Sequence, residues 1–213
     1  MTQDTIGIIG AGIAGLSCAT TLQHAGLNPI IFDKGRGLGG RLATRRTASG
    51  LQFDHGAQYA TARSEEFGKV IAAAIRAGQV ATWDTGESPR YVGVPGMNGL
   101  AKFLAKGLEI HQNTQISAVR DTADACDVTA GDQTWHFKTL AVTVPAPQAI
   151  TLLGEQHALS PKLSDVELLP CLTLMAAFPA EATIPFTARR DPDDALSWIA
   201  LDSSKPQRSA QQC

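Results

Sequence analysis

The stretch IGIIGAGIAGL, from Ile6 to Leu16, places three glycines between an apolar run and the start of a helical pattern. The glycines have the GxGxxG spacing, in which the first allows a tight bend, the second admits a pyrophosphate to the backbone, and the third lets helix and strand pack closely. Phosphates are favoured at a helix N-terminus because its free N–H groups and dipole attract anions. We therefore predict a dinucleotide-binding turn made of Gly10, Ala11, Gly12, Ile13, Ala14 and Gly15.

Regular patterns on both sides of this turn predict a strand–helix–strand unit. Residues 5–9 form a short apolar strand, residues 14–24 carry an apolar stripe typical of a helix, and PIIFD at 29–33 forms a second strand. The unit has the length expected for a parallel crossover. The sequence therefore predicts an α/β fold with a Rossmann-like domain.

Asp33 ends the second predicted strand. A carboxylate at this position can accept hydrogen bonds from both ribose hydroxyls of an adenosine, and it would repel a 2′-phosphate. The acid therefore favours FAD or NAD over NADP. The alternative is a helix-packing turn followed by an incidental acid.

A basic, glycine-rich loop, KGRGLGGR, follows the acid from Lys34 to Arg41. Its doublet, Gly39 and Gly40, resembles that of the glutathione-reductase-like flavoproteins, particularly their amine-oxidase branch. This resemblance implies FAD as the cofactor, with the doublet beside the pyrophosphate and Lys34 among the cofactor-binding residues. It also implies that Arg41 makes a charged contact to the pyrophosphate or to flavin-side groups. Arg46 is expected to be solvated.

Later stretches narrow the resemblance to the bacterial renalases. They are DHGAQY at 54–59, TAR at 61–63, RYVGVPGM at 90–97, PAPQ at 145–148, and Trp198 with SKP at 204–206. The resemblance implies an FAD enzyme that oxidises the 1,2- and 1,6-isomers of dihydronicotinamide dinucleotides. Molecular oxygen would then reoxidise the flavin and yield peroxide.

The same resemblance implies further cofactor-binding residues and a division into domains. It places Gly56, Ala57, Gln58 and Tyr59 along the isoalloxazine and Gly96 and Met97 at the border of the flavin. It also implies that the backbone of Val119 faces the adenine. Residues 1–62 and 96–154 would form a discontinuous FAD-binding domain, and 63–95 with 155–213 a sheet-containing substrate domain. The family continues beyond the position of Cys213, so this substrate domain is expected to be incomplete.

Other local patterns predict the remaining elements. Ser64 is a plausible N-cap for one of two further helices. The sequence predicts helices at 63–78 and 98–108, strands at 80–83, 90–94, 171–178 and 196–201, and several short strands between residues 109 and 144.

Composition excludes several classes of partner. The chain has 213 residues, 44% of them hydrophobic, with a formal net charge of −2 and a pI near 6.2. These values suit a globular protein and favour neither nucleic acid nor an anionic membrane as partner. The four cysteines are widely spaced, which indicates reduced thiols and a cytoplasmic protein, and the histidines lack metal-site spacing.

Two rival functions stay open at this point. An NAD-dependent dehydrogenase would explain the GxGxxG turn and Asp33 but not the glycine doublet. A non-catalytic dinucleotide-binding fragment is the second rival, and an amine-oxidase-type flavoprotein is a variant of the main hypothesis.

Overall fold

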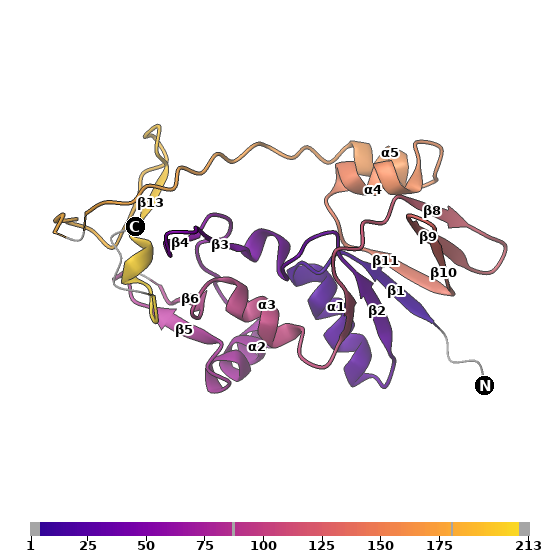
Figure 1. Ribbon diagram of the computed structural model, residues 1–213, viewed down its shortest axis with the longest axis horizontal. Helices are drawn as coiled ribbons and strands as arrows, with labels where there is room; N and C mark the ends of the chain where they lie inside the picture. Colours follow the sequence, from indigo (N-terminus) through magenta and orange to yellow (C-terminus); the bar gives the residue numbers. More distant parts are fainter. Residues whose placement is uncertain (1–4, 87, 180, 209–213) are drawn as a thin grey trace. The chain divides into compact units, whose positions relative to one another are not determined.

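Four parallel strands surround the glycine-rich turn in the computed structural model, which describes residues 5–86, 88–179 and 181–208 (Figure 1). Their order is β11 (Thr139–Val142), β1 (Ile6–Ile9), β2 (Pro29–Phe32) and β7 (Glu109–His111). Helix α1 (Ile13–His24) connects β1 to β2 and contacts both strands. The predicted α/β fold with a parallel sheet is confirmed.

A second, antiparallel sheet packs on this parallel sheet through a buried apolar cluster. Its strands are β8 (Ala118–Asp121), β9 (Cys126–Ala130) and β10 (Gln133–Phe137). Ile9 and Phe32 join Val119, Val128 and Phe137 in the shared cluster. Because side chains alternate along a strand, the buried Ile8 and Ile31 lie on the other face of the parallel sheet.

Two helices that the sequence did not predict follow the last parallel strand. They are α4 (Ala146–Leu153), which contacts β8, and α5 (Ser160–Ser164), which contacts α4. Proline is compatible with the first turn of a helix, because the N–H groups there have no helical partner.

The remaining elements are two helices and three separate hairpins. They are β3 (Thr44–Arg46) with β4 (Gln52–Asp54), α2 (Glu65–Arg76), β5 (Val80–Trp83) with β6 (Arg90–Gly93), α3 (Asn98–Leu104), and β12 (Ala188–Arg190) with β13 (Trp198–Ala200). Short 3₁₀ turns occupy Gly40–Leu42 and Asp202–Ser204. The predicted cap of α2 is present, since the Ser64 side chain accepts a hydrogen bond from the Phe67 N–H at 3.2 Å.

The chain divides into two compact units. The first unit is Met1–Gly40 with Leu104–Cys171, and the second unit is Arg41–Phe103 with Leu172–Cys213. These boundaries fall at other positions than those of the expected FAD-binding and substrate domains. The assignment of those two functions to parts of the chain stays a prediction.

Two predicted elements need correction. The helix predicted to reach residue 108 ends at Leu104, because the chain turns through Gly107 at a φ of +79° and enters β7. The strand predicted at 171–178 does not form, apart from an isolated bridge position at Phe178, and Leu172 and Leu174 are 97% and 83% exposed. Apolar residues favour a strand only where a neighbouring strand can pair with its backbone, and no strand among the described residues does so here.

Candidate dinucleotide-binding site

Each of the three glycines in the turn meets a different physical demand. Gly10 has a φ of +106°, and its N–H donates to the Phe32 carbonyl at 2.8 Å, which joins the ends of β1 and β2. A Cβ atom at Gly15 would collide with the Gly10 carbonyl oxygen. Gly12 differs from both, since its φ of −76° suits any residue and an added Cβ would meet nothing within 4 Å. The protein itself therefore does not require glycine at 12, and this position leaves the N-terminus of α1 open to a ligand.

Asp33 lies directly after β2 and stabilises the turn through hydrogen bonds. Its carboxylate accepts hydrogen bonds from the Ala11 N–H at 2.6 Å and the Gly35 N–H at 2.7 Å. An ionised carboxylate has about four acceptor sites, so two remain for ribose hydroxyls. The predicted ribose contact is therefore compatible with the structural role.

The glycine doublet runs alongside the turn. The Gly39 N–H donates to the Ala11 carbonyl at 2.9 Å, and Gly39 forms an isolated β-bridge with Gly12. Both doublet residues have positive φ, +106° at Gly39 and +51° at Gly40, and a Cβ at Gly40 would lie 3.6 Å from the Gly12 Cα. Two glycine segments thus border the same opening at the start of α1.

Two other predicted residues of this unit lie at its edges. Lys34 is exposed, and its Nζ lies 3.4 Å from the Gln148 side-chain oxygen. Val119 has its side chain in the apolar cluster, so only the backbone of the edge strand β8 could face a ligand there. This arrangement is compatible with the implied backbone contact to adenine, which stays a prediction.

In the second unit, the backbone of Arg41 holds the start of the segment expected along the isoalloxazine. The Arg41 carbonyl accepts the Ala57 N–H at 2.8 Å. A Cβ at Gly56 would collide with that carbonyl, so glycine is required for the close approach. The Arg41 side chain is exposed, whereas the neighbouring His55 has a buried Nδ1 with no hydrogen-bond partner among the described residues.

A buried cluster of charges lies behind this segment, and we name Asp54, Asp202, Lys205 and Arg208 the charge cluster. Lys205 Nζ contacts Asp202 at 2.6 Å and Asp54 at 3.2 Å, and Arg208 Nη2 contacts Asp54 at 2.5 Å. The side chains of Asp54 and Lys205 are both 0% exposed. Two carboxylates and two cations make the cluster neutral overall, which offsets the cost of burying each charge.

The charge cluster perturbs the acidity of Asp54. Burial raises the pKa of this carboxyl, but the charges of Lys205 and Arg208 lower it, as do hydrogen bonds from the Met97 N–H at 2.9 Å and the Thr44 hydroxyl at 2.7 Å. The lowering contributions win, so the pKa of Asp54 lies below its usual value.

The same cluster positions two of the predicted cofactor-binding residues, Gln58 and Met97. The side-chain oxygen of Gln58 accepts from Lys205 at 3.1 Å, and its amide donates to the Asp54 carbonyl. Met97 is buried and bound to Asp54, and a Cβ at the preceding Gly96 would crowd the Thr44 side chain. The structure thus brings Gln58 and Met97 to one buried acid, and Gly96 lies against the Thr44 side chain that donates to the same acid.

Tyr59 is held by a cation and a second aromatic ring. The buried Arg90 guanidinium lies 4.7 Å from the Tyr59 ring centre and 4.9 Å from that of Trp198. The two rings are 5.4 Å apart. Cation–π contacts of this kind are strong when the cation is desolvated, so the orientation of Tyr59 is well defined.

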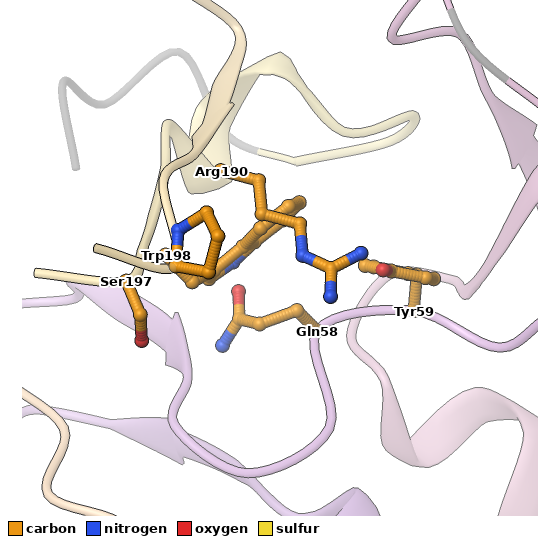
Figure 2. A pocket seen from close by; sticks show the side chains of 6 residues that line it. Gln58, Tyr59, Arg190, Ser197 and Trp198 are labelled. Carbon is orange, nitrogen blue, oxygen red and sulfur yellow. The ribbon is translucent and has the colours of Figure 1, made fainter. Parts of the chain in front are cut away.

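Open cavities occur in both units. One, of about 500 Å³, is lined by Gln58, Tyr59, Arg190, Pro192, Ser197 and Trp198 (Figure 2). The other, of about 440 Å³, is lined by His111, Gln133, Thr134 and Trp135 and by none of the predicted site residues. Of these two cavities, the 500 Å³ cavity is the one lined by predicted cofactor-binding residues, Gln58 and Tyr59.

Comparison with known proteins agrees with the geometry of the turn. Residues 8–74 match the family model of the NAD(P)-binding Rossmann-like domain. The chain contains a Rossmann-like domain. A 15-cis-phytoene desaturase from Synechococcus elongatus is 41% identical over 51 residues, which are 24% of this chain and 11% of that protein.

Two solved structures share the fold beyond the Rossmann-like domain. A protein that bears the name protoporphyrinogen oxidase, from Exiguobacterium sp. 255-15, has a TM-score of 0.62 at 15% identity. A CLA-producing fatty acid isomerase from P. acnes has a TM-score of 0.60 at 13% identity. Each likeness covers 77% of this chain and 64% of the other, and at these identities it shows the fold alone. No described helix is long and apolar enough to cross a bilayer.

Sequence reasoning located the Rossmann-like turn but missed the charge cluster and Arg190. Lys205 and Trp198 entered only as parts of a resemblance, and Asp54 was not assigned to the site. Lysine and arginine are almost always exposed, so a buried lysine cannot be predicted from the local sequence pattern. A carboxylate directly after the buried Phe53 was the one available signal, and it is a weak one.

Proposed function

We propose that this chain is an FAD-dependent oxidoreductase. The observation that carries the proposal is the opening at the start of α1, bordered by Gly12 on one side and the doublet Gly39–Gly40 on the other. A diphosphate needs close backbone approach and unpaired N–H groups, and this opening offers both. Asp33 beside it supplies acceptors for a ribose.

FAD fits these residues better than NAD does, because the doublet has no role in a simple nicotinamide site. In the second unit, the buried and unpaired His55 Nδ1 lies next to the segment assigned to the isoalloxazine, which agrees with a polar group from outside the described chain. When bound, FAD would supply a hydride acceptor. The names of two relatives, a desaturase and an oxidase, are those of oxidoreductases and support the same class.

The residues of the chain have distinct roles in this proposal. The N-terminus of α1 binds the pyrophosphate, Asp33 accepts from the ribose, and Arg41 provides a positive charge. Gln58 and Tyr59 present a rigid surface, because the charge cluster and Arg90 hold them. Rigid surroundings exclude water and keep a reacting ring in one orientation.

The proposed substrate class is the isomeric dihydronicotinamide dinucleotides, with molecular oxygen as the electron acceptor. The motifs shared with the bacterial renalases, from DHGAQY to SKP, support this choice. No protein base is needed, because a hydride leaves an already reduced ring. The chain covers 64% of the solved structures to which it is similar, so the substrate and the electron acceptor of the whole protein stay proposals.

Flavin titration tests the cofactor. FAD should bind more tightly than FMN. The turn, Asp33 and the doublet are proposed to bind the adenosine and the pyrophosphate, and FMN lacks both groups. The measurement is quenching of flavin fluorescence with each flavin in turn. Equal affinity for the two flavins would contradict the proposal.

Arg41→Ala tests the charged contact, with Arg46→Ala as a matched control on an exposed arginine of the same segment. A charged hydrogen bond contributes about 1.5–3 kcal/mol, so Arg41→Ala should weaken FAD binding by about 10- to 100-fold. The control should bind as the wild type does. If the two variants are equal, Arg41 does not contact the cofactor.

The description NAD(P)-binding in the matching family model favours one rival, a nicotinamide-dependent dehydrogenase. Visible absorption separates the two functions, since bound flavin absorbs there and nicotinamide does not. Tight NAD binding with no flavin affinity would establish the rival.

A further inference from the structure

The hairpin of β12 and β13 contributes one wall of the 500 Å³ cavity in the second unit. In its antiparallel register Arg190 lies opposite Trp198, and Arg189 lies opposite Ile199. Residues that lie directly opposite share a face of the sheet, and neighbours along a strand point to opposite faces. Arg190 and Trp198 therefore both face the cavity, as Figure 2 shows, and Arg189 points away from it.

The two arginines differ in their partners. Arg189 Nη2 pairs with Asp194 at 2.9 Å and with Asp191 at 3.2 Å. Arg190 has no acidic partner among the described residues, although it is exposed and its guanidinium extends toward Tyr59 (Figure 2). Within the described part of the chain, the cavity therefore contains a cation without an acidic partner.

Two further polar groups of the cavity wall can donate hydrogen bonds. The Ser197 side chain is exposed, and the buried Trp198 Nε1 has no acceptor among the described residues. Gln58 does not change this balance, because Lys205 and the Asp54 carbonyl already use both ends of its amide. None of the described residues that line the cavity carries a carboxylate.

Aromatic surface adjoins these donors. Tyr59 and Trp198 form part of the wall, and the buried Arg90 holds both rings in place. A fixed aromatic wall favours a flat ring, and a free guanidinium with nearby donors favours an anion.

We propose that this cavity binds a planar ring that carries a carboxylate or a phosphate, and that Arg190 is the residue that recognises the anionic group. One part of this inference rests on the proposed function, namely that the ring belongs to the substrate that is oxidised. The anion contact itself follows from the Arg190 guanidinium, for which the described residues offer no acidic partner, and from the donors around it.

Three probes test the proposal by titration calorimetry. Nicotinate and nicotinamide have the same ring, but only nicotinate is an anion at neutral pH, and reduced nicotinamide mononucleotide adds a phosphate. Nicotinate or the mononucleotide should bind about tenfold or more tightly than nicotinamide, as a charged hydrogen bond implies. Whichever anion is preferred identifies the carboxylate or the phosphate as the group recognised.

Arg190→Ala should abolish this preference, and Arg190→Lys should restore part of it. The matched control is Arg189→Ala, which removes a paired arginine on the opposite face and should keep the preference of the wild type. Equal binding of all three probes to the wild type, or equal effects of the two alanine variants, would overturn the proposal.

The FAD titration separates this inference from the proposed function. If FAD fails to bind but Arg190→Ala still removes the anion preference, the cavity proposal stands and the proposed function fails. If FAD binds as expected and the anion preference is absent, the proposed function stands and the cavity proposal fails.

Discussion

The Rossmann-like turn and the charge cluster hold their surroundings by different physical means. Around the turn, neutral backbone hydrogen bonds and glycines at close approaches place Gly10, Gly15 and Gly39. Around Asp54, four side chains of opposite charge lie together, and three of them come from residues near the end of the described chain. The first arrangement depends on local backbone shape, and the second depends on charges that only folding brings together.

The largest effect is expected from Lys205→Met, which leaves Asp202 and Asp54 short of a cation in a buried site. Breaking a buried ion pair costs about 3–5 kcal/mol of the free energy of unfolding. Chemical denaturation measures it. The control is Lys69→Met, because Lys69 and its partner Glu65 are 72% and 77% exposed and should contribute less than about 1 kcal/mol. A cost below that of the control would show that the cluster does not stabilise its unit.

The second-largest loss of stability is expected from Gly15→Ala. The new Cβ collides with a backbone oxygen, which cannot move aside by a change of rotamer as a side chain can. We expect a loss of about 3 kcal/mol. Gly12→Ala adds the same methyl group into open space and should cost less than about 1 kcal/mol while weakening FAD binding. If both variants lose equal stability, the different roles assigned to these glycines are wrong.

A smaller effect should distinguish the hydrogen bonds of the two regions. Thr44 donates to the Asp54 carboxylate at 2.7 Å, whereas Thr143 donates to the neutral carbonyl of Ile9 at 2.9 Å. Hydrogen bonds to charged groups are stronger, so Thr44→Val should cost about 2 kcal/mol and Thr143→Val about 1 kcal/mol. Thermal unfolding of the two variants gives the comparison, and the reverse order would contradict it.

Acid should produce the smallest effect, because burial raises the pKa of Asp54 and partly cancels the lowering by its cations. The folded-state pKa still lies below the unfolded value of about 3.9. The stability that this shift contributes is therefore complete above that value and disappears as the pH falls through the folded pKa. Unfolding free energies between about pH 5 and pH 2 should show the loss, and Asp54→Asn should reduce the slope. An unchanged slope in the variant would assign the acid sensitivity to other carboxyl groups.

The predicted elements of the turn were found close to their expected bounds. The strand at 5–9, the helix at 14–24 and the strand at 29–33 appear as β1, α1 and β2. Their signals are local, since glycine spacing and apolar periodicity act within a few residues. The strand expected at 171–178 failed for the opposite reason, because a strand depends on a partner that the local pattern does not supply.

The sequence by itself determined the Rossmann-like turn, because a bend at Gly10, close packing at Gly15 and an acid at the end of β2 follow from residues adjacent in the chain. Only the tertiary structure decided that Lys205 is buried against Asp54, and that Arg190 faces the cavity while Arg189 is paired on the other side. Burial and strand register depend on contacts between distant segments. The side chains that surround the proposed substrate are therefore fixed by folding, and the backbone proposed to bind phosphate is fixed by local sequence.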